Sequence, residues 1–126
     1  MNIVVVDDEP ALLESMRCYL TRLGHAVVGL QDARSAWEYF AGDPSGEYVI
    51  IIDLTLEGMS GEELIRKVIE RKPDMAVIAT SGYPPALHGL RELGAARLAT
   101  LEKPFTPRML TQALESLLTS QRSALG

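Results

Sequence analysis

The sequence of 126 residues predicts an α/β fold, in which a doubly wound, five-stranded parallel sheet carries helices on both faces. Apolar segments of strand length alternate five times with segments of helical periodicity, which is typical of βαβ units around a parallel sheet. The strand segments are apolar at consecutive positions, as expected for strands that are covered on both sides. Right-handed crossovers then complete the doubly wound arrangement.

Five short segments rich in Val, Ile, Leu and Ala form the predicted strands. The second is less apolar than the first, third and fourth, and the fifth is mixed in character. Each segment is bounded by turn or helix signals, so each is a separate element. In chain order the strands are residues 3–6, 25–30, 48–53, 75–81 and 97–101.

The first two helices have recognisable ends. Pro10 precedes the first helix and Gly24 closes it, while Asp32 can cap the second. Apolar residues at helical spacing give each helix one inward face, and we expect Trp37 to pack there rather than to bind a ligand. The inward residues are Leu13, Met16, Leu20 and Leu23, followed by Ala33, Ala36, Trp37, Phe40 and Ala41.

The later helices differ in strength. The residues "SGEE" at 60–63 form a capping box, and Pro73 ends the helix that follows. Residues 84–95 predict a weaker helix, because Gly89 at its centre costs ~1 kcal/mol relative to alanine. Thr106 and Pro107 begin a long final helix with a regular apolar face.

Composition limits the classes of function. Lys and Arg number 12 against 17 Asp and Glu, a net charge of −5, so the sequence predicts no direct nucleic-acid binding. The apolar runs are too short to cross a membrane, and no basic leader precedes the first strand. A single cysteine, Cys18, fits a reducing compartment, and we expect it to be buried or half-buried. We therefore expect one cytoplasmic domain spanning residues 1–126, with a core at about 2–120.

Chemically distinctive residues follow four of the five predicted strands. Asp7 and Asp8 follow the first strand, Asp53 ends the third, Ser81 ends the fourth, and Lys103 follows the fifth. Taken singly, these residues could be solvated acids, a turn former and a surface lysine. Because ligands of an open parallel sheet bind at the carboxyl ends of its strands, their combination predicts one site.

The residue types predict the chemistry of this site. Three convergent carboxylates repel one another unless a hard dication with oxygen ligands neutralises them, and Mg²⁺ binds in this way with few protein carboxylates. A carboxylate in such a site can attack phosphorus and form an aspartyl phosphate. The dication, an ammonium group and a hydroxyl would stabilise the transferred phosphoryl group.

Four motifs, in order and in register, resemble those of the receiver domain of two-component response regulators. They are "VVDDEP", "IIDLTLEGMSG", "TSGY" and "LEKPF", and the resemblance covers roughly residues 2–120. It implies a flavodoxin-like topology with strand order 2-1-3-4-5. The sequences "TSGYPP" and "LEKPF" are similar to those found in the receiver domains of hybrid sensor histidine kinases.

The resemblance also implies roles for individual residues. Asp53 would be the phosphoacceptor, and Ser81 and Lys103 would contact the phosphoryl group. Mg²⁺, or Mn²⁺, would be held by Asp7, Asp8, Asp53 and the backbone carbonyl of Thr55. The bond between Lys103 and the next residue, a proline, is similar to one that is usually cis in the family.

Three further positions bear on the conformational switch: one matches the family pattern and two depart from it. Gly61 matches a glycine that shapes the loop after the phosphoacceptor. Glu57 stands where proline is usual, and we expect it to face solvent. Thr100 stands where the family usually has Phe or Tyr, so either Tyr83 takes part in switching or the fourth-helix face is not the main output.

The sequence thus predicts a phosphoryl-accepting switch, not a stand-alone enzyme. Its expected partners are a histidine kinase or phosphotransfer protein and a downstream effector protein or attached domain, and a homodimer is compatible with the sequence. Two alternatives lack the residues they require. An aspartyl-phosphate phosphatase would need a second acid two residues after the nucleophile, where this chain has Thr55. A flavodoxin-like cofactor binder would need a phosphate-binding loop where this chain has the acidic segment "DDEPAL". A degenerate receiver that acts only as an interaction module is the remaining alternative.

Overall fold

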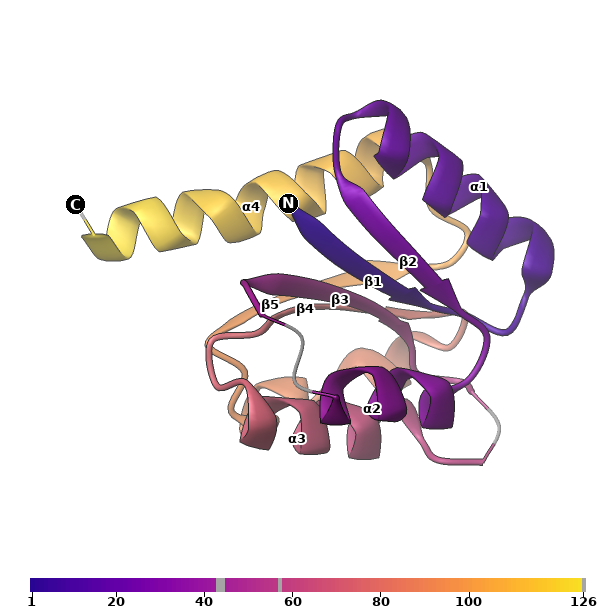
Figure 1. The fold of residues 1–126 in the computed structure, drawn as a ribbon, viewed down its shortest axis with the longest axis horizontal. Coiled ribbons are helices and arrows are strands. Elements are labelled where there is room, and N and C mark those ends of the chain that lie inside the picture. Colours follow the sequence, from indigo (N-terminus) through magenta and orange to yellow (C-terminus); the bar gives the residue numbers. More distant parts are fainter. Residues whose placement is uncertain (43–44, 57, 126) are drawn as a thin grey trace.

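The computed structural model describes residues 1–42, 45–56 and 58–125, with side chains described up to residue 117. Five parallel strands form one sheet in the order β2-β1-β3-β4-β5, which confirms the predicted topology (Figure 1). The strands are β1 (Asn2–Val6), β2 (Ala26–Leu30), β3 (Tyr48–Asp53), β4 (Ala76–Ser81) and β5 (Arg97–Glu102).

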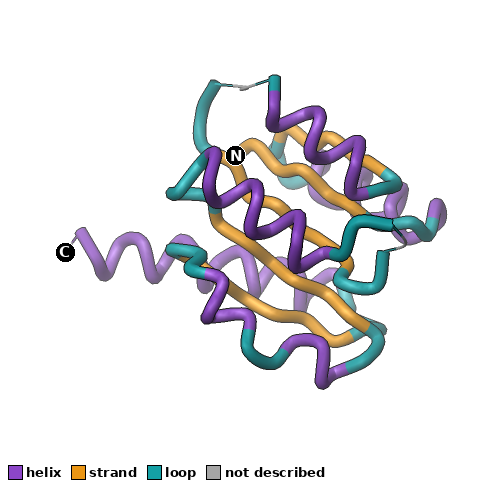
Figure 2. The backbone as a smooth tube through the Cα atoms, turned by 90° about the horizontal axis from the view of Figure 1, so that it is seen from below, coloured by secondary structure: helices purple, strands orange, loops and turns teal. Residues whose placement is uncertain are grey.

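Helices cover both faces of the sheet, as the apolar strands require. The α-helices are α1 (Pro10–Arg22), α2 (Ala33–Ala41), α3 (Gly61–Arg71) and α4 (Pro107–Leu125). Figure 1 shows α1 and α4 on one face and α2 and α3 on the other, and Figure 2 shows the same layers from below. Asp32 and Ser60 cap α2 and α3, accepting backbone N–H groups at 2.7 and 3.1 Å, as predicted.

The crossover from β4 to β5 is helical, but it is not the single weak helix that the sequence predicts. It consists of two short 3₁₀ helices, η1 (Pro84–Leu87) and η2 (Leu90–Leu93). Two consecutive prolines open η1, and Gly89 between the two helices has a φ of 78°, in the left-handed region. An α-helix cannot continue through a left-handed residue, so the crossover is divided there.

Alternating strand residues supply two separate cores. Ile3, Val5 and Ile51 belong to the cluster beneath α1 and α4, whereas Ile50 and Ile52 belong to the cluster beneath α2 and α3. Complete burial of such a side chain contributes roughly 1.5–3 kcal/mol. The central strands are therefore held from both sides, and the residues at their carboxyl ends sit on a rigid base.

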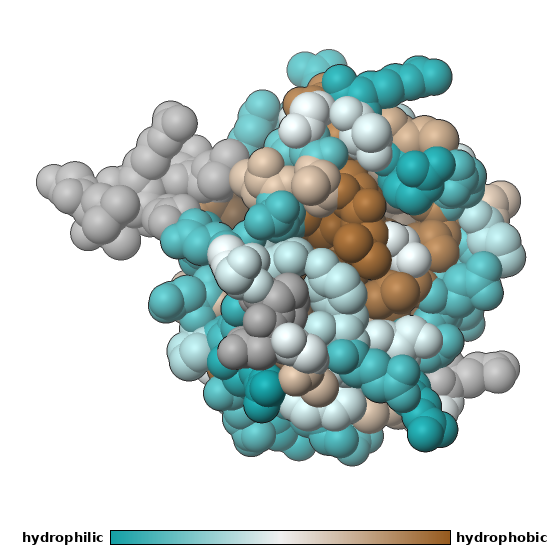
Figure 3. Space-filling view, in the orientation of Figure 1, coloured by the Kyte–Doolittle hydropathy of each residue, from teal (hydrophilic) through white to brown (hydrophobic). Residues whose placement is uncertain are grey.

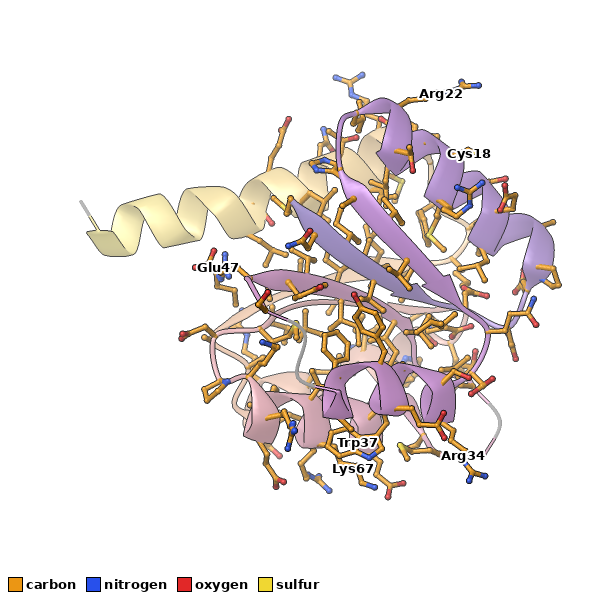
Figure 4. All side chains as sticks on the ribbon, in the orientation of Figure 1. Cys18, Arg22, Arg34, Trp37, Glu47 and Lys67 are labelled. Atoms are coloured by element: carbon orange, nitrogen blue, oxygen red, sulfur yellow. The ribbon has the colours of Figure 1, made fainter. Side chains whose placement is uncertain are left out.

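The surface differs from the sequence prediction at three residues. Leu23 and Ala41, which the helical spacing predicts to face inward at the ends of the first two helices, are exposed. Cys18 is exposed on α1 and lies 3.4 Å from the Glu14 carboxylate, so the prediction of burial is wrong (Figure 4). Trp37 is half-buried and packs against the second core, as predicted. Figure 3 shows apolar surface over the edge strand β2, most of whose residues are only partly buried. Across the described ranges, no helix has the length and apolarity of a membrane span.

Candidate functional site

The predicted site residues meet at the carboxyl edge of the sheet. Asp7, Asp53 and Ser81 have no more than 1% of their surface exposed, and Lys103 has 13% of its side chain exposed. Parallel register explains the meeting, because Val6 lies opposite Ile52 at the end of β1 and β3. In a sheet of this kind the residues that follow each strand emerge at the same edge.

Lys103 links the acidic residues of the site. Its Nζ lies 2.9 Å from Asp7 Oδ2, 2.9 Å from Asp53 Oδ2 and 3.4 Å from Glu9 Oε1. Burial acts to lower the pKa of the Lys103 ammonium, but its close contacts with the Asp7 and Asp53 carboxylates outweigh burial and raise that pKa. Lys103 is therefore a permanent cation in the site.

Asp53 uses both carboxylate oxygens. Oδ1 accepts the Thr55 backbone N–H at 2.9 Å and the Thr55 hydroxyl at 2.6 Å, while Oδ2 accepts Lys103 Nζ at 2.9 Å. Burial acts to raise the pKa of Asp53, but these bonds to Thr55 and Lys103 lower it below its ordinary value of 3.8. Asp53 is thus an ionised, oriented carboxylate at neutral pH.

Asp7 is less well satisfied. Oδ1 accepts the Glu9 backbone N–H at 2.9 Å, but Oδ2 is buried and has no partner in hydrogen-bond geometry among the described residues. Oδ2 lies within ion-pair distance of Lys103, so its nearest support is electrostatic rather than a directed hydrogen bond. Burial is the main cause of the raised pKa of Asp7. The contacts with Glu9 and Lys103 act to lower this pKa but do not outweigh burial.

The three aspartates could hold a metal ion. Asp7, Asp8 and Asp53 each offer a carboxylate oxygen, and these oxygens lie within 4.8 Å of one another. Hard oxygen ligands fit Mg²⁺ or Mn²⁺. The buried Asp7 Oδ2 accepts no hydrogen bond among the described residues, so it is available as such a ligand. Thr55 lies in the adjoining loop, and the use of its backbone carbonyl as a ligand stays a prediction.

Ser81, the first residue of the predicted switch, is joined to the site because the Lys103 backbone N–H donates to its carbonyl at 2.8 Å. Ser81 Oγ donates to the Tyr83 carbonyl at 3.1 Å and accepts the Tyr83 N–H at 2.9 Å. Tyr83 is 63% exposed, and Thr100 is exposed on β5. Glu57 lies outside the described residues. The bond between Lys103 and Pro104 is cis, as predicted.

Gly61 is a glycine for a reason of space. A Cβ at this position would lie 2.8 Å from Leu54 Cα and 3.0 Å from the Asp53 carbonyl oxygen. The first residue of α3 therefore packs directly against the backbone that carries Asp53. This contact agrees with the loop-shaping role that the sequence predicts.

Sequence reasoning assigned no role to Glu9, which the structure places at the site. Its backbone N–H orients Asp7, and its carboxylate reaches Lys103, which is 94 residues away in the chain. Glu9 directly follows Asp8 at the end of a predicted strand. That position is the signal that could have included it with the other acids.

The parallel α/β fold and the site at its carboxyl edge are those of a two-component signalling domain, with Asp7, Asp53 and Ser81 buried and Lys103 partly buried. The chain belongs to the response regulator receiver domain family, whose sequence model matches residues 3–115. The family's members are signalling modules of two-component systems.

Curated relatives include proteins of different length. A chemotaxis protein CheY homolog of Campylobacter jejuni is 31% identical over 121 residues, covering 94% of this chain and 92% of that protein. The C4-dicarboxylate transport transcriptional regulatory protein DctD of Pseudomonas aeruginosa is 28% identical over 124 residues, covering 98% of this chain. This chain spans about a quarter (26%) of DctD.

Solved structures share the fold. A CheY-like receiver domain protein from Methanospirillum hungatei has a TM-score of 0.84 and 26% identity, covering 98% of this chain and 97% of that one. The response regulator TrrA from Thermotoga maritima, solved in complex with Mg²⁺ and BeF, has a TM-score of 0.74 and 25% identity. The match with TrrA covers 92% of this chain and 97% of that one.

Proposed function

We propose that this chain acts as one receiver domain that accepts a phosphoryl group on Asp53 from a phosphohistidine and changes conformation in response. The observation that carries the proposal is the state of Asp53, which is buried, ionised and held between Thr55 and Lys103. A carboxylate in this environment is a nucleophile with its charge-stabilising partner already in place.

In the proposed reaction an Asp53 carboxylate oxygen attacks the phosphorus of a phosphohistidine. The new P–O bond forms as the P–N bond breaks, and the departing histidine nitrogen keeps the electron pair and takes up a proton. Hydrolysis resets the switch, since water attacks the phosphorus and releases inorganic phosphate from the restored carboxylate. The chain undergoes its own modification and does not turn over as a stand-alone enzyme.

Each site residue has a defined part in this proposal. Asp7, Asp8, Asp53 and the Thr55 carbonyl would hold Mg²⁺ or Mn²⁺, which supplies charge neutralisation at the phosphoryl oxygens. Lys103 orients Asp53 and then contacts a phosphoryl oxygen. The Mg²⁺ and BeF in the TrrA structure support this assignment of the metal.

The conformational response would begin at Ser81. Its two hydrogen bonds with Tyr83 must break when its hydroxyl turns toward the phosphoryl group, which releases the start of the crossover. The crossover consists of two short 3₁₀ helices rather than one α-helix, so few bonds oppose its movement. Thr100 is too small to replace an aromatic residue in this response, and the exposed Tyr83 is the aromatic residue that adjoins Ser81.

The proposed partners are a histidine kinase or phosphotransfer protein and an effector protein or attached domain, in the cytoplasm. A groove of about 380 Å³ beside the acceptor offers Leu12, Pro104 and Phe105 as apolar contacts for the donor. A homodimer enters the proposal only as one way in which phosphorylation could be passed on as a signal. The alternative, a degenerate receiver that acts by contact alone, makes the opposite prediction about phosphorylation.

The test is the intact mass of the protein after incubation with acetyl phosphate. We expect a Mg²⁺-dependent gain of one phosphoryl group, and we expect Asp53→Ala to abolish it, because the proposed acceptor carboxylate is removed. Asp74→Ala, which replaces an exposed aspartate outside the site, is the matched control and should be phosphorylated like the wild type. No gain in mass, together with no binding of beryllofluoride, would favour the degenerate receiver.

Metal binding gives a separate prediction. Mg²⁺ at about a hundredfold excess over its Kd should raise the free energy of unfolding by about 2.7 kcal/mol, as measured by urea denaturation. Asp8→Asn should remove most of this gain, because asparagine lacks the carboxylate charge that would bind the dication. Asp8 is the exposed member of the aspartate cluster, so the substitution does not create a buried cavity. Equal stabilisation of Asp8→Asn and the wild type by Mg²⁺ would place the metal elsewhere.

A further inference from the structure

Glu9 occupies the mouth of the site without belonging to the buried acceptor. Its carboxylate is 63% exposed, yet Oε1 lies 3.4 Å from Lys103 Nζ. Asp7 and Asp53 already pair with the same ammonium at 2.9 Å each. Lys103 therefore keeps two closer partners if Glu9 loses its charge, and the Glu9 carboxylate is not needed to hold it.

The charge of the site makes Glu9 notable. Asp7, Asp8, Asp53 and Glu9 carry four negative charges, and Lys103 supplies one positive charge at the centre. A phosphoryl donor is itself an anion and must approach this excess of negative charge. A bound dication would neutralise charge on the three aspartates, whereas Glu9 adds a negative charge beyond that set.

Glu9 also lies where a donor would approach. It lines the groove beside the acceptor together with Leu12, Lys103, Pro104 and Phe105. A donor carried on a protein can gain apolar contacts with Leu12 and Phe105 that offset the repulsion. A small free donor has no such contacts and meets the repulsion alone.

We propose that Glu9 is a specificity-determining residue, which slows phosphorylation by small, free, multiply charged donors and thereby favours a donor delivered by a docked protein. This inference rests on the proposed function, because it requires that Asp53 accept phosphoryl groups. Glu9 acts by charge at the entrance and takes no part in bond formation.

The test compares Glu9→Gln with the wild type, using acetyl phosphate, a dianion at neutral pH, and phosphoramidate, a monoanion. In each case an Asp53 oxygen attacks phosphorus, and acetate or ammonia leaves with the electron pair of the broken P–O or P–N bond. Glutamine keeps a hydrogen-bond acceptor for Lys103 while removing the charge. Rates are measured at Mg²⁺ concentrations that calorimetric titration shows to be saturating for each variant.

We expect Glu9→Gln to accelerate phosphorylation by acetyl phosphate about fivefold and by phosphoramidate about twofold, because Coulomb energy scales with donor charge. The acceleration should shrink as ionic strength rises. Glu9→Asp should resemble the wild type. Glu115→Gln, an equal change of net charge at an exposed position on α4, should alter neither rate.

Three results would overturn the inference while leaving the proposed function intact, provided that wild-type Asp53 is phosphorylated. They are an unchanged rate with acetyl phosphate, a slower rate, and an equal acceleration with both donors that does not depend on salt. The last two would indicate that Glu9 positions Lys103 rather than repelling the donor. Failure of the wild type to gain a phosphoryl group would instead contradict the proposed function.

Discussion

Replacing Lys103 with methionine is expected to lower the free energy of unfolding by about 3 kcal/mol at neutral pH without Mg²⁺. Methionine keeps much of the length of the side chain but removes the cation that Asp7 and Asp53 share at 2.9 Å. Both carboxylates are almost fully buried, so each would be left as an uncompensated charge. Urea denaturation followed by circular dichroism measures the loss.

The pH dependence identifies the cause of this loss. In the wild type, the lowered pKa of Asp53 gives stability above the ordinary value of 3.8, and this stability is lost as pH falls through the folded value. Without Lys103 the pKa of Asp7, already raised by burial, should rise further, and the pKa of Asp53 should rise above its ordinary value. The variant then becomes less stable as pH rises from that ordinary value toward neutrality, and the two stability curves converge in acid.

Two further comparisons make the Lys103 prediction specific. Mg²⁺ should restore much of the stability of Lys103→Met, because a dication neutralises the same carboxylates. Lys67→Met is the matched control, since Lys67 lies 5.6 Å from the Trp37 ring centroid on the far helices and its loss should cost under about 1 kcal/mol. A deficit in Lys103→Met that is the same at every pH would point to lost packing instead.

The positions of the acidic residues could be predicted because strand ends are visible in the sequence. The apolar run before Asp7 and the run that ends at Asp53 each stop at a carboxylate. Once both runs are read as parallel strands, the register places their ends at one edge. The residues that the site needs therefore follow from local patterns and one rule of topology.

Contacts between distant side chains could not be predicted in the same way. Glu9 reaches Lys103 across 94 residues, and only the geometry of the loops after β1 and β5 brings them together. The division of the crossover at Gly89 depends on a left-handed backbone that a helical pattern does not reveal. Cys18 falls at a position whose exposure depends on how α1 is rotated over the sheet, which a small residue does not indicate.

Gly61→Ala is expected to destabilise the fold by about 3 kcal/mol, because its Cβ would meet backbone atoms that cannot move aside. The Cβ would lie 2.8 Å from Leu54 Cα and 3.0 Å from the carbonyl oxygen of Asp53. Relief of this contact requires α3 to separate from the loop after β3. The shift would carry Asp53 away from Lys103 and slow phosphorylation about tenfold or more, because small displacements of reacting groups are costly.

Gly82→Ala separates this steric effect from the general effect of replacing a glycine. A Cβ at Gly82 would meet nothing within 4 Å, and the residue does not have a positive φ. Its free energy of unfolding should stay within about 0.5 kcal/mol of the wild type in the same urea titration. If Gly61→Ala were as stable as Gly82→Ala, the start of α3 would be free to move from the backbone of Asp53. The helix would then not fix the position of the acceptor.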